Sequence, residues 1–332
     1  MRPLVSMVVP CYNVEKKIVN LLESVLKQTY TNIEAIFVDD GSTDKTKEVI
    51  FSYKEKLEAL GINFNYILQE NQGAAGAIRT GLEYVTGKYL IWPDADDILM
   101  ETSIEKKVEF LETNSEYSMV RTNAYIIDSD NIEEKSKLAL SAKQLKRSKI
   151  FEECIRFKSF YCPGIYMIRW QSFLNINPDK YIYPTYSGQN IQMIVPMAYH
   201  YMCGYIDEPL YGYVIYKDSH SRLGGNKTYE RKIKQSKGLE DIVVNTLKRL
   251  NLGTVKDLKN IKNDFAIRRL QIAYVNDKKE DKKLEYAQMS RLSRCNPVFI
   301  MAMKMKKNKF VDTLLDFYNK AQILKFKLKN KE

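Results

Sequence analysis

Residues 87–99 read GKYLIWPDADDIL, a short apolar run that ends in three aspartates. The run Tyr89–Pro93 is apolar, brief and followed at once by acidic residues, which predicts a buried β-strand with a polar loop at its carboxyl end. In an extended segment, side chains two residues apart point the same way and lie roughly 6.5–7 Å apart. Asp94 and Asp96 therefore point the same way.

This acidic loop has two interpretations, one structural and one functional. In the first, Asp94, Asp96 and Asp97 are solvated acids that cap the following helix. Three carboxylates after a buried strand, however, need a partner that reduces their repulsion. Because the separation is wide for one ion, we expect Asp96 to bind a metal and Asp94 a ribose hydroxyl or a metal-bound water. Mg²⁺ or Mn²⁺ would also bridge diphosphate oxygens.

The stretch before this loop alternates strand and helix patterns, which indicates a parallel sheet covered by helices on both faces. Ligands of such sheets bind at the carboxyl ends of the strands. The expected strands are Leu4–Pro10, Ile33–Asp39 and Asn63–Leu68, and the expected helices are Glu15–Lys27, Asp44–Leu60 and Ala74–Val85.

Two further strand ends carry polar residues. The first strand continues into Pro10-Cys11-Tyr12-Asn13 and the second into Asp39-Asp40-Gly41-Ser42. A turn at Gly41 followed by a helix N-cap at Ser42, Thr43 or Asp44 explains much of the second loop, but not its doubled aspartate. A carboxylate that accepts the imide N–H of uracil would explain it, so we expect Asp40 to read the base.

A third loop, Asn71-Gln72-Gly73-Ala74-Ala75-Gly76-Ala77, begins a helix with side chains too small to block a close ligand. It lacks the glycine spacing of dinucleotide-binding loops and the lysine of a P-loop. Arg79 on the same helix either reaches the ligand or faces solvent.

The remaining sequence divides by composition and charge. Residues 1–225 carry 25 Lys/Arg against 29 Asp/Glu, and residues 226–332 carry 27 against 12. We expect a catalytic domain over 1–225, with a donor half (1–100) and an acceptor half (101–225), and a basic helical region over 226–332. In the acceptor half we expect a helix and a strand up to Ile127, then a loop plus a helix over 128–160, a helix Gln189–Tyr201 and a strand Tyr205–Ile215. In the basic region, Gly253 and Pro297 are expected to break the helices.

The two histidines, His200 and His220, are too few for a histidine-rich metal site, and the five cysteines have no spacing typical of zinc or of a disulfide framework. No apolar run is long enough to span a bilayer, and the first residues lack the features of a signal peptide. These features predict a cytoplasmic protein.

The last helix, expected over 308–330, combines an apolar stripe with surrounding lysines. Such a helix can lie on the anionic inner face of a membrane. It can equally pack on the catalytic domain, support a homo-oligomer or hold an acidic protein acceptor. Nucleic-acid binding is not expected, because no recognised motif accompanies the charge. The stripe comprises Phe310, Leu314, Phe317, Ala321, Leu324 and Leu328.

Taken in order, five stretches resemble family 2 glycosyltransferases of the GT-A fold, a Rossmann-like, mostly parallel α/β sheet. They are VVPCYN (8–13), SVLKQTY (24–30), VDDGSTDKT (38–46), NQGAAGAIRTGL (71–82) and GKYLIWPDADDIL (87–99). The resemblance implies inverting, metal-assisted transfer from a UDP-sugar to a growing cell-surface glycan, on a lipid or a protein. It places uracil at Pro10, Tyr12 and Asp40, and the sugar nucleotide and metal at Asp94 and Asp96. Asn13, Gly73, Arg79 and Ala95 are expected beside them.

The sequence departs from the family where an acid pair usually supplies the general base. Here Gly188-Gln189-Asn190 precedes a helix, and an amide cannot take a proton from an acceptor hydroxyl at neutral pH. Gln189 and Asn190 can instead bind the donor sugar or the acceptor. The base is left open among Asp97, Asp179 and Asp207. Thr80, where the family often has asparagine after Arg79, is a second departure.

His220 lies in a polar loop after a predicted strand. A histidine in many GT-A enzymes completes the metal or diphosphate site, so His220 is either such a ligand, with Arg222 as a diphosphate partner, or a surface residue. His200, inside an apolar helix, is expected to be structural. The leading hypothesis is therefore a glycosyltransferase, and the alternative is a non-catalytic subunit of the same fold that partners an active enzyme. Nucleotidyl transfer is disfavoured, because the Pro10–Asn13 loop lacks glycine, arginine and lysine.

Overall fold

The computed structural model describes residues 2–135, 137–157, 161–185, 188–216 and 228–329. The chain forms two compact units. The first unit comprises Met1–Ser221 with Asn245–Leu252, and the second comprises Arg222–Val244 with Gly253–Glu332. Both units are therefore built partly from the long helix α10 (Tyr229–Arg249).

The first unit is built on one sheet, in the order β3-β2-β1-β4-β8-β6-β9-β5 with β7 added to β6. β3, β2, β1 and β4 run parallel to one another, whereas β8 runs antiparallel to both β4 and β6. The strands are β1 Val5–Cys11, β2 Ile33–Asp39, β3 Asn63–Leu68, β4 Tyr89–Ile91, β5 Ile98–Leu99, β6 Met119–Asp128, β7 Lys137–Leu138, β8 Tyr166–Arg169 and β9 Cys203–Ile215.

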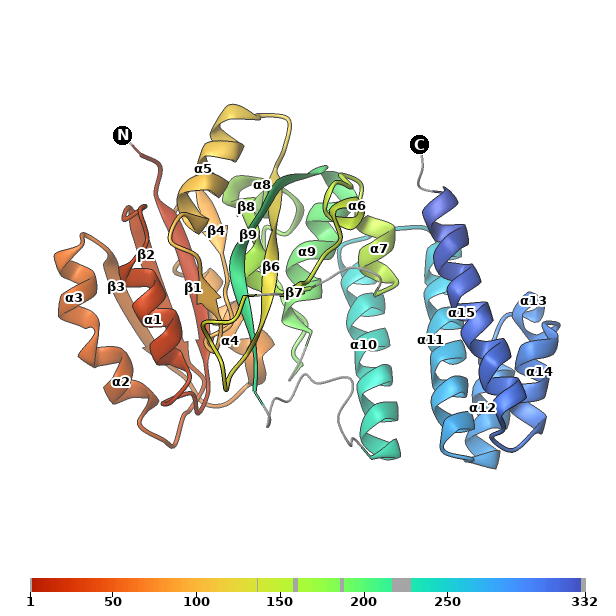
Figure 1. Ribbon diagram of the computed structural model, residues 1–332. Helices are drawn as coiled ribbons and strands as arrows, with labels where there is room; N and C mark the ends of the chain where they lie inside the picture. Colours follow the sequence, from red (N-terminus) through yellow and green to blue (C-terminus); the bar gives the residue numbers. More distant parts are fainter. Residues whose placement is uncertain (1, 136, 158–160, 186–187, 217–227, 330–332) are drawn as a thin grey trace. The chain divides into compact units, whose positions relative to one another are not determined.

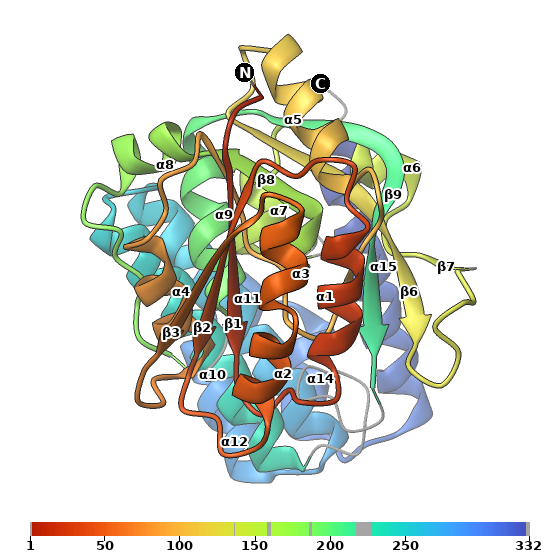
Figure 2. The same ribbon diagram turned by 90° about the vertical axis from the view of Figure 1, so that its left-hand side faces the viewer.

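Strand β1 is the point at which the chain changes direction across the sheet. β2 and β3 lie on one side of β1, and β4 returns to its other side. Right-handed crossovers then put α1, α2 and α3 on one face and α4 on the other, as Figures 1 and 2 show. The carboxyl ends of β1, β2 and β4 meet at this switch point, which is where open α/β sheets bind ligands. The predicted α/β architecture is confirmed.

Helices of the first unit bury the apolar faces that their periodicity predicts. In α1, Ile18, Leu21, Leu22 and Val25 are buried. The helices are α1 Ile18–Leu26, α2 Thr46–Ser52, α3 Lys54–Ala59, α4 Gly73–Leu82, α5 Ser103–Thr113, α6 Ala142–Leu145, α7 Phe151–Ile155, the 3₁₀ turn η1 Pro163–Ile165, α8 Trp170–Ile176 and α9 Gln189–His200.

Two predictions of local structure were wrong. The single helix expected over Asp44–Leu60 is two helices, because the N–H of Tyr53 bonds back to Ile50 and Phe51 and tightens the turn between them. The loop and single helix expected over 128–160 instead contain β7 and two short helices. The first of these, α6, starts at a capping box in which Ser141 and Gln144 satisfy each other's backbone N–H groups.

The second unit is helical, as the sequence predicts. Its core is formed by apolar residues of α11, α14 and α15, including Leu270, Phe299 and Val311, all with 0% exposure. Arg269 of α11 is also buried, and it pairs with Glu240 and Glu285. The helices that follow α10 are α11 Val255–Val275, α12 Lys279–Gln288, α13 Arg291–Arg294, α14 Pro297–Lys304 and α15 Lys309–Lys329.

The helix breaks in this unit follow the predicted residues. Gly253 adopts a φ of 74° between α10 and α11, and Pro297 is the first residue of α14. Among the described residues, no helix is both long enough and apolar enough to cross a membrane. Four cysteines, Cys11, Cys154, Cys162 and Cys203, are buried thiols, and Cys295 is exposed.

Candidate functional site

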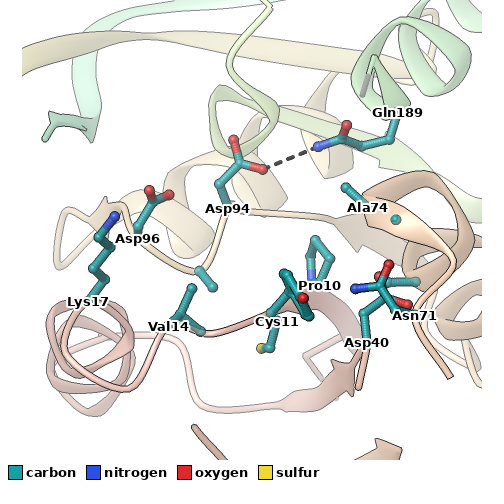
Figure 3. Close-up of a pocket in the computed structure, with 14 residues that line it drawn as sticks. Pro10, Cys11, Val14, Lys17, Asp40, Asn71, Ala74, Asp94, Asp96 and Gln189 are labelled. Atoms are coloured by element: carbon teal, nitrogen blue, oxygen red, sulfur yellow. Dashed lines mark hydrogen bonds between the residues drawn. The ribbon is translucent and has the colours of Figure 1, made fainter. Parts of the chain in front are cut away.

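A cavity of about 490 Å³ opens at the carboxyl ends of β1, β2 and β4. Figure 3 shows its residues converging from the loops after these strands, from the starts of α1 and α4, and from α9. The predicted loops therefore meet at one place. The lining residues are Pro10, Cys11, Tyr12, Val14, Lys17, Asp40, Asn71, Gly73, Ala74, Ala77, Asp94, Ala95, Asp96 and Gln189.

The two aspartates after β2 have different surroundings. Asp39 accepts hydrogen bonds from the N–H of Ser42 (2.8 Å) and the hydroxyl of Tyr66 (2.7 Å), so it braces the turn against β3. Asp40 lines the cavity, and its Oδ1 accepts from Gln69 Nε2 (2.6 Å) and from the N–H of Gln72 (2.8 Å). These contacts fix the orientation of the Asp40 carboxylate beside the start of α4.

The loop after β1 is tied to the loop after β2. Asn13 has a positive φ of 50°, a conformation that asparagine tolerates better than most residues. Its Oδ1 accepts the N–H of Thr43 (2.8 Å), and its own N–H donates to Ser42 Oγ (3.0 Å). Asn13 thus holds the loop shape, whereas Pro10 and the half-exposed Tyr12 face the cavity.

The carboxylates of the 94–97 loop carry a concentrated negative charge. Asp94 and Asp96 line the cavity, with Ala95 between them. Burial, and next the charge of Asp96, raise the pKa of Asp94 to about 7. A bound cation would relieve this cost, because positive charge favours the ionised form of a carboxylate.

The donor set fits Mg²⁺ or Mn²⁺ bound together with a diphosphate. Both ions prefer oxygen ligands and keep several positions for water and phosphate. Within the described residues, no group of three or more His, Cys, Asp or Glu side chains is arranged to hold a metal by itself. Asp94 and Asp96 would therefore supply only part of the coordination. His220 and Arg222, the other predicted ligands, lie outside the described residues.

Asp97 does not share this cavity-facing position. It is 1% exposed, and its carboxylate accepts the N–H of Val214 (2.8 Å) and the hydroxyl of Tyr211 (2.9 Å), both from β9. The thiol of Cys162 also points to it at 3.7 Å. This engagement favours a structural role for Asp97 over that of a general base.

The other two candidate bases lie at the surface in ion pairs. Asp179 pairs with Arg249 at 2.9 Å, and Asp207 pairs with Lys146 at 3.7 Å. Their side chains are 70% and 56% exposed. Neither residue is among those that line the cavity in the described part of the chain.

Gln189 and Asn190 begin α9, after Gly188 in a left-handed conformation with a φ of 80°. Gln189 lines the cavity, and its Nε2 lies 3.5 Å from Asp94 Oδ1, as the dashed line in Figure 3 marks. Asn190 instead donates to the carbonyl of Tyr161 (3.1 Å). The two amides thus diverge, and only Gln189 is placed beside Asp94.

The start of α4 is shaped by small residues. Gly73 has a φ of 78°, and Ala74 and Ala77 line the cavity. A Cβ on Gly76 would lie 2.4 Å from Gln72 Cβ, so this glycine allows the turn of chain that presents the N–H of Gln72 to Asp40. Arg79 is exposed on α4 and is not among the lining residues that the structure describes.

Sequence reasoning missed several residues of the site. Lys17 lines the cavity at the start of α1, but the pair Lys16-Lys17 resembles the solvated charge common at helix ends. Gln69 and Tyr66, which orient Asp40 and Asp39, lie at the end of β3 and carry no motif of their own. Only the parallel pairing of β2 with β3 brings them to the aspartates.

Comparisons with known proteins agree with this architecture. The family model of glycosyl transferase family 2 matches residues 6–208. The Escherichia coli protein WfaP, named a UDP-Glc:alpha-D-GlcNAc-diphosphoundecaprenol beta-1,3-glucosyltransferase, is 39% identical over 110 residues, which cover 33% of this chain and 42% of WfaP. The chain spans between 32% and 44% of the length of the first curated relatives.

Two solved structures share the fold. Staphylococcus aureus TarS 1-349, in complex with UDP-GlcNAc, superposes with a TM-score of 0.63 over 93% of this chain and 83% of its own, at 17% identity. The mannosyltransferase PcManGT of Pyrobaculum calidifontis, in complex with GDP-Man and Mn²⁺, gives 0.58 over 97% of this chain and 81% of its own, at 15% identity. At such identities the likeness shows the GT-A fold alone.

Proposed function

Because this chain belongs to glycosyl transferase family 2, we propose that it is a glycosyltransferase that moves a hexose or N-acetylhexosamine from a UDP-sugar to a growing cell-surface glycan. The observation that carries the proposal is the convergence of Asp40, Asp94 and Asp96 on one cavity at the switch point of the sheet. The UDP-glucose in the name of the Escherichia coli relative supports the choice of donor.

Each side of the cavity has a task in this proposal. Asp40, oriented by Gln69 and Gln72, accepts the imide N–H of uracil, and Pro10 and Tyr12 pack on the base. Asp94 and Asp96 hold Mn²⁺ or Mg²⁺ and the ribose-diphosphate. When bound, the metal supplies positive charge that stabilises the diphosphate leaving group. Gln189, beside Asp94, binds the donor sugar or the acceptor.

The reaction is an inverting displacement. The acceptor hydroxyl oxygen forms a bond to the anomeric carbon, the bond from that carbon to the β-phosphate oxygen breaks, and the hydroxyl proton is lost to a base. UDP leaves with the electron pair of the broken bond. Residues 1–100 form the donor half in this scheme, residues 101–225 the acceptor half, and residues 226–332 a helical region.

A donor assay tests the proposal. We expect UDP release from at least one of a panel of UDP-sugars in the presence of Mn²⁺, and its loss on addition of EDTA. Asp96→Ala should lower the rate by about 10²-fold or more, because an electrostatic stabiliser of the leaving group is lost. A matched control is Asp179→Ala, which removes an exposed aspartate outside the cavity. No UDP release and no transfer with any donor would favour the non-catalytic subunit.

The last helix supports a further part of the proposal, which is contact with an anionic membrane surface. α15 buries Val311 and Leu315 in the core of the helical unit, while Phe310 and Phe317 of the predicted stripe are 64% and 72% exposed. Leu324 and Leu328 lie among side chains outside the described set. Exposed lysines at 304, 306, 307 and 309 precede Phe310. Exposed aromatic rings beside lysines are typical of a surface that binds anionic lipid.

This placement would put the enzyme on the inner face of the cell membrane, near a lipid-linked acceptor like the one in the name of WfaP. We expect the protein to sediment with vesicles that contain phosphatidylglycerol but not with pure phosphatidylcholine. The double variant Phe310→Ser/Phe317→Ser should lose this binding. If the variant binds these vesicles as well as wild type does, α15 is not the membrane-binding element. If wild type is a dimer and the variant a monomer, the apolar stripe instead contacts a second copy of the chain.

A further inference from the structure

Lys17 is a cation placed among carboxylates. It lines the same cavity as Asp40, Asp94 and Asp96, and within the described residues it is the one Lys or Arg in the lining. Figure 3 shows its side chain extending from the start of α1 toward Asp96. The chain therefore brings a positive charge close to the loop that we propose to hold the metal.

The position of Lys17 is supported by Tyr216, the residue directly after β9. Its ammonium lies 4.5 Å from the centre of the Tyr216 ring, a distance at which the ring face attracts a cation. The Tyr216 hydroxyl donates to the carbonyl of Asp96 (3.3 Å), and Asn20 of α1 approaches the same hydroxyl at 3.5 Å. Tyr216 thus joins the aspartate loop to α1 and presents its ring to the lysine.

The charge balance of the site calls for a cation in addition to the metal. A divalent cation bound by Asp94 and Asp96 has its charge cancelled by these two carboxylates, so the diphosphate still needs positive charge nearby. The start of α1 contributes backbone N–H groups with partial positive charge, and an ammonium has three donors on a flexible stem. Lys17 can supply this charge to a phosphate between α1 and Asp96.

We propose that Lys17 binds the diphosphate of the sugar nucleotide and stabilises the negative charge that develops on the diphosphate as UDP leaves. Tyr216 positions the Lys17 side chain for this role. This inference rests on the proposed function. The competing explanation is that Lys17 serves only as a counter-ion to Asp96 and has no contact with the nucleotide.

Binding of UDP and of uridine separates these explanations without any need for turnover. We expect Lys17→Met to weaken UDP binding in the presence of Mn²⁺ by about 10- to 100-fold, as for loss of a charge-assisted hydrogen bond, and to leave uridine affinity unchanged. Calorimetry measures UDP, and displacement of UDP measures uridine. Lys17→Arg should restore most of the affinity. Lys16→Met, which removes the exposed neighbouring charge, is the matched control.

The outcomes are distinguishable. Unchanged UDP affinity in Lys17→Met contradicts the inference and assigns the lysine to Asp96 alone. An equal loss of UDP affinity in Lys16→Met also contradicts it, because the effect is then one of net charge. A wild-type protein that binds UDP-sugars neither with nor without Mn²⁺ overturns the proposed function itself.

Two variants test the role of Tyr216 by separating the contribution of its ring from that of its hydroxyl. Tyr216→Phe keeps the ring under the ammonium, and Tyr216→Leu removes it. If Tyr216 positions Lys17, the leucine variant should lose UDP affinity while keeping uridine affinity, and the phenylalanine variant should stay within about threefold of wild type. A loss of both ligands in both variants would indicate a general disturbance of the loop and contradict the positioning role.

Discussion

At the residue scale, Asp97 shares a short loop with Asp94 and Asp96, yet its hydrogen bonds run to β9. Val214 and Tyr211 donate to its two oxygens, and its burial raises the pKa of its carboxyl well above the usual value. The adjacent negative charges of Asp96 and Asp94 act in the same direction. Three aspartates that look equivalent in sequence thus divide into two that line the cavity and one that anchors the loop.

Asp97→Asn tests this division. The amide keeps an oxygen for the N–H of Val214 and can donate to the Tyr211 hydroxyl, so we expect UDP-release activity within about tenfold of wild type. Loss of a general base would instead cost about 10²- to 10⁴-fold. Asp97→Ala should destabilise the fold by about 1–3 kcal/mol, because it leaves buried partners unsatisfied. Steady-state kinetics and thermal unfolding of both variants provide the measurements.

The sequence predicts Asp40 as the residue that reads the uracil base, but it does not show what holds Asp40 and its neighbour Asp39 in place. Asp39 and Asp40 follow one another, and their different surroundings come from Tyr66 of β3 and from Gln69, which directly follows that strand. Asn13 is a similar case, since its amide bonds the loop after β2. Such non-local partners cannot be identified from a motif, because they depend on which strands pair.

At the element scale, the turn η1 packs under the last strand. A Cβ on Gly164 would lie 1.8 Å from the Tyr211 ring, the same ring that carries the hydroxyl bound to Asp97. The absence of a side chain at this one position therefore lets β9 hold the aspartate loop. Gly164 thus influences, through Tyr211 and Asp97, the shape of the loop that lines the cavity.

We expect Gly164→Ala to displace the Tyr211 ring, lower the melting temperature and weaken UDP binding, because overpacking a core costs about 1–3 kcal/mol. Gly238→Ala is the control. It lies within α10 with no atom within 4 Å of the added Cβ, so it should stabilise the helix by up to about 1 kcal/mol. Thermal unfolding and calorimetry report both effects. If Gly164→Ala binds UDP as wild type does, the packing of η1 does not influence the proposed UDP site.

Elements with a strong apolar pattern were predicted well, and those without one were not. Strands β2 and β3 have the predicted bounds, and α9 differs from its prediction by one residue. The failures, over 44–60 and 128–160, fall where short elements are fixed by single backbone bonds or by a cap. The division into two helices at Tyr53 depends on the hydrogen bonds of one backbone N–H, and the spacing of apolar residues gives no sign of it.

At the scale of the whole molecule, one buried lysine should change how the free energy of unfolding depends on pH. Lys107 of α5 has 0% exposure, and its Nζ donates to the carbonyl of Gly164 (2.6 Å) and to Ser103 Oγ (3.1 Å). Burial lowers the pKa of Lys107 to about 7. The folded protein therefore prefers the neutral amine, whereas the unfolded chain keeps the ordinary lysine pKa.

Between pH 7 and the ordinary lysine pKa, the unfolded state binds more protons, so the contribution of Lys107 to stability rises with pH. The slope is at most about 1.4 kcal/mol per pH unit for one proton. Denaturant unfolding of wild type and Lys107→Met across this range should show the difference. The variant curve should be flatter, and parallel curves would show that Lys107 titrates alike in both states.

The single exposed cysteine offers a practical consequence. Cys295 ends α13 in the helical unit, while the four other thiols are buried and burial raises their pKa, that of Cys203 to about 12. A thiol reacts as the accessible thiolate, so a maleimide dye should attach to the native protein at one place. Cys295 is thus a native site for a fluorescent label, and it lies in the same unit as α15. A change in dye emission on adding vesicles would report the proposed membrane docking in real time without any engineered cysteine.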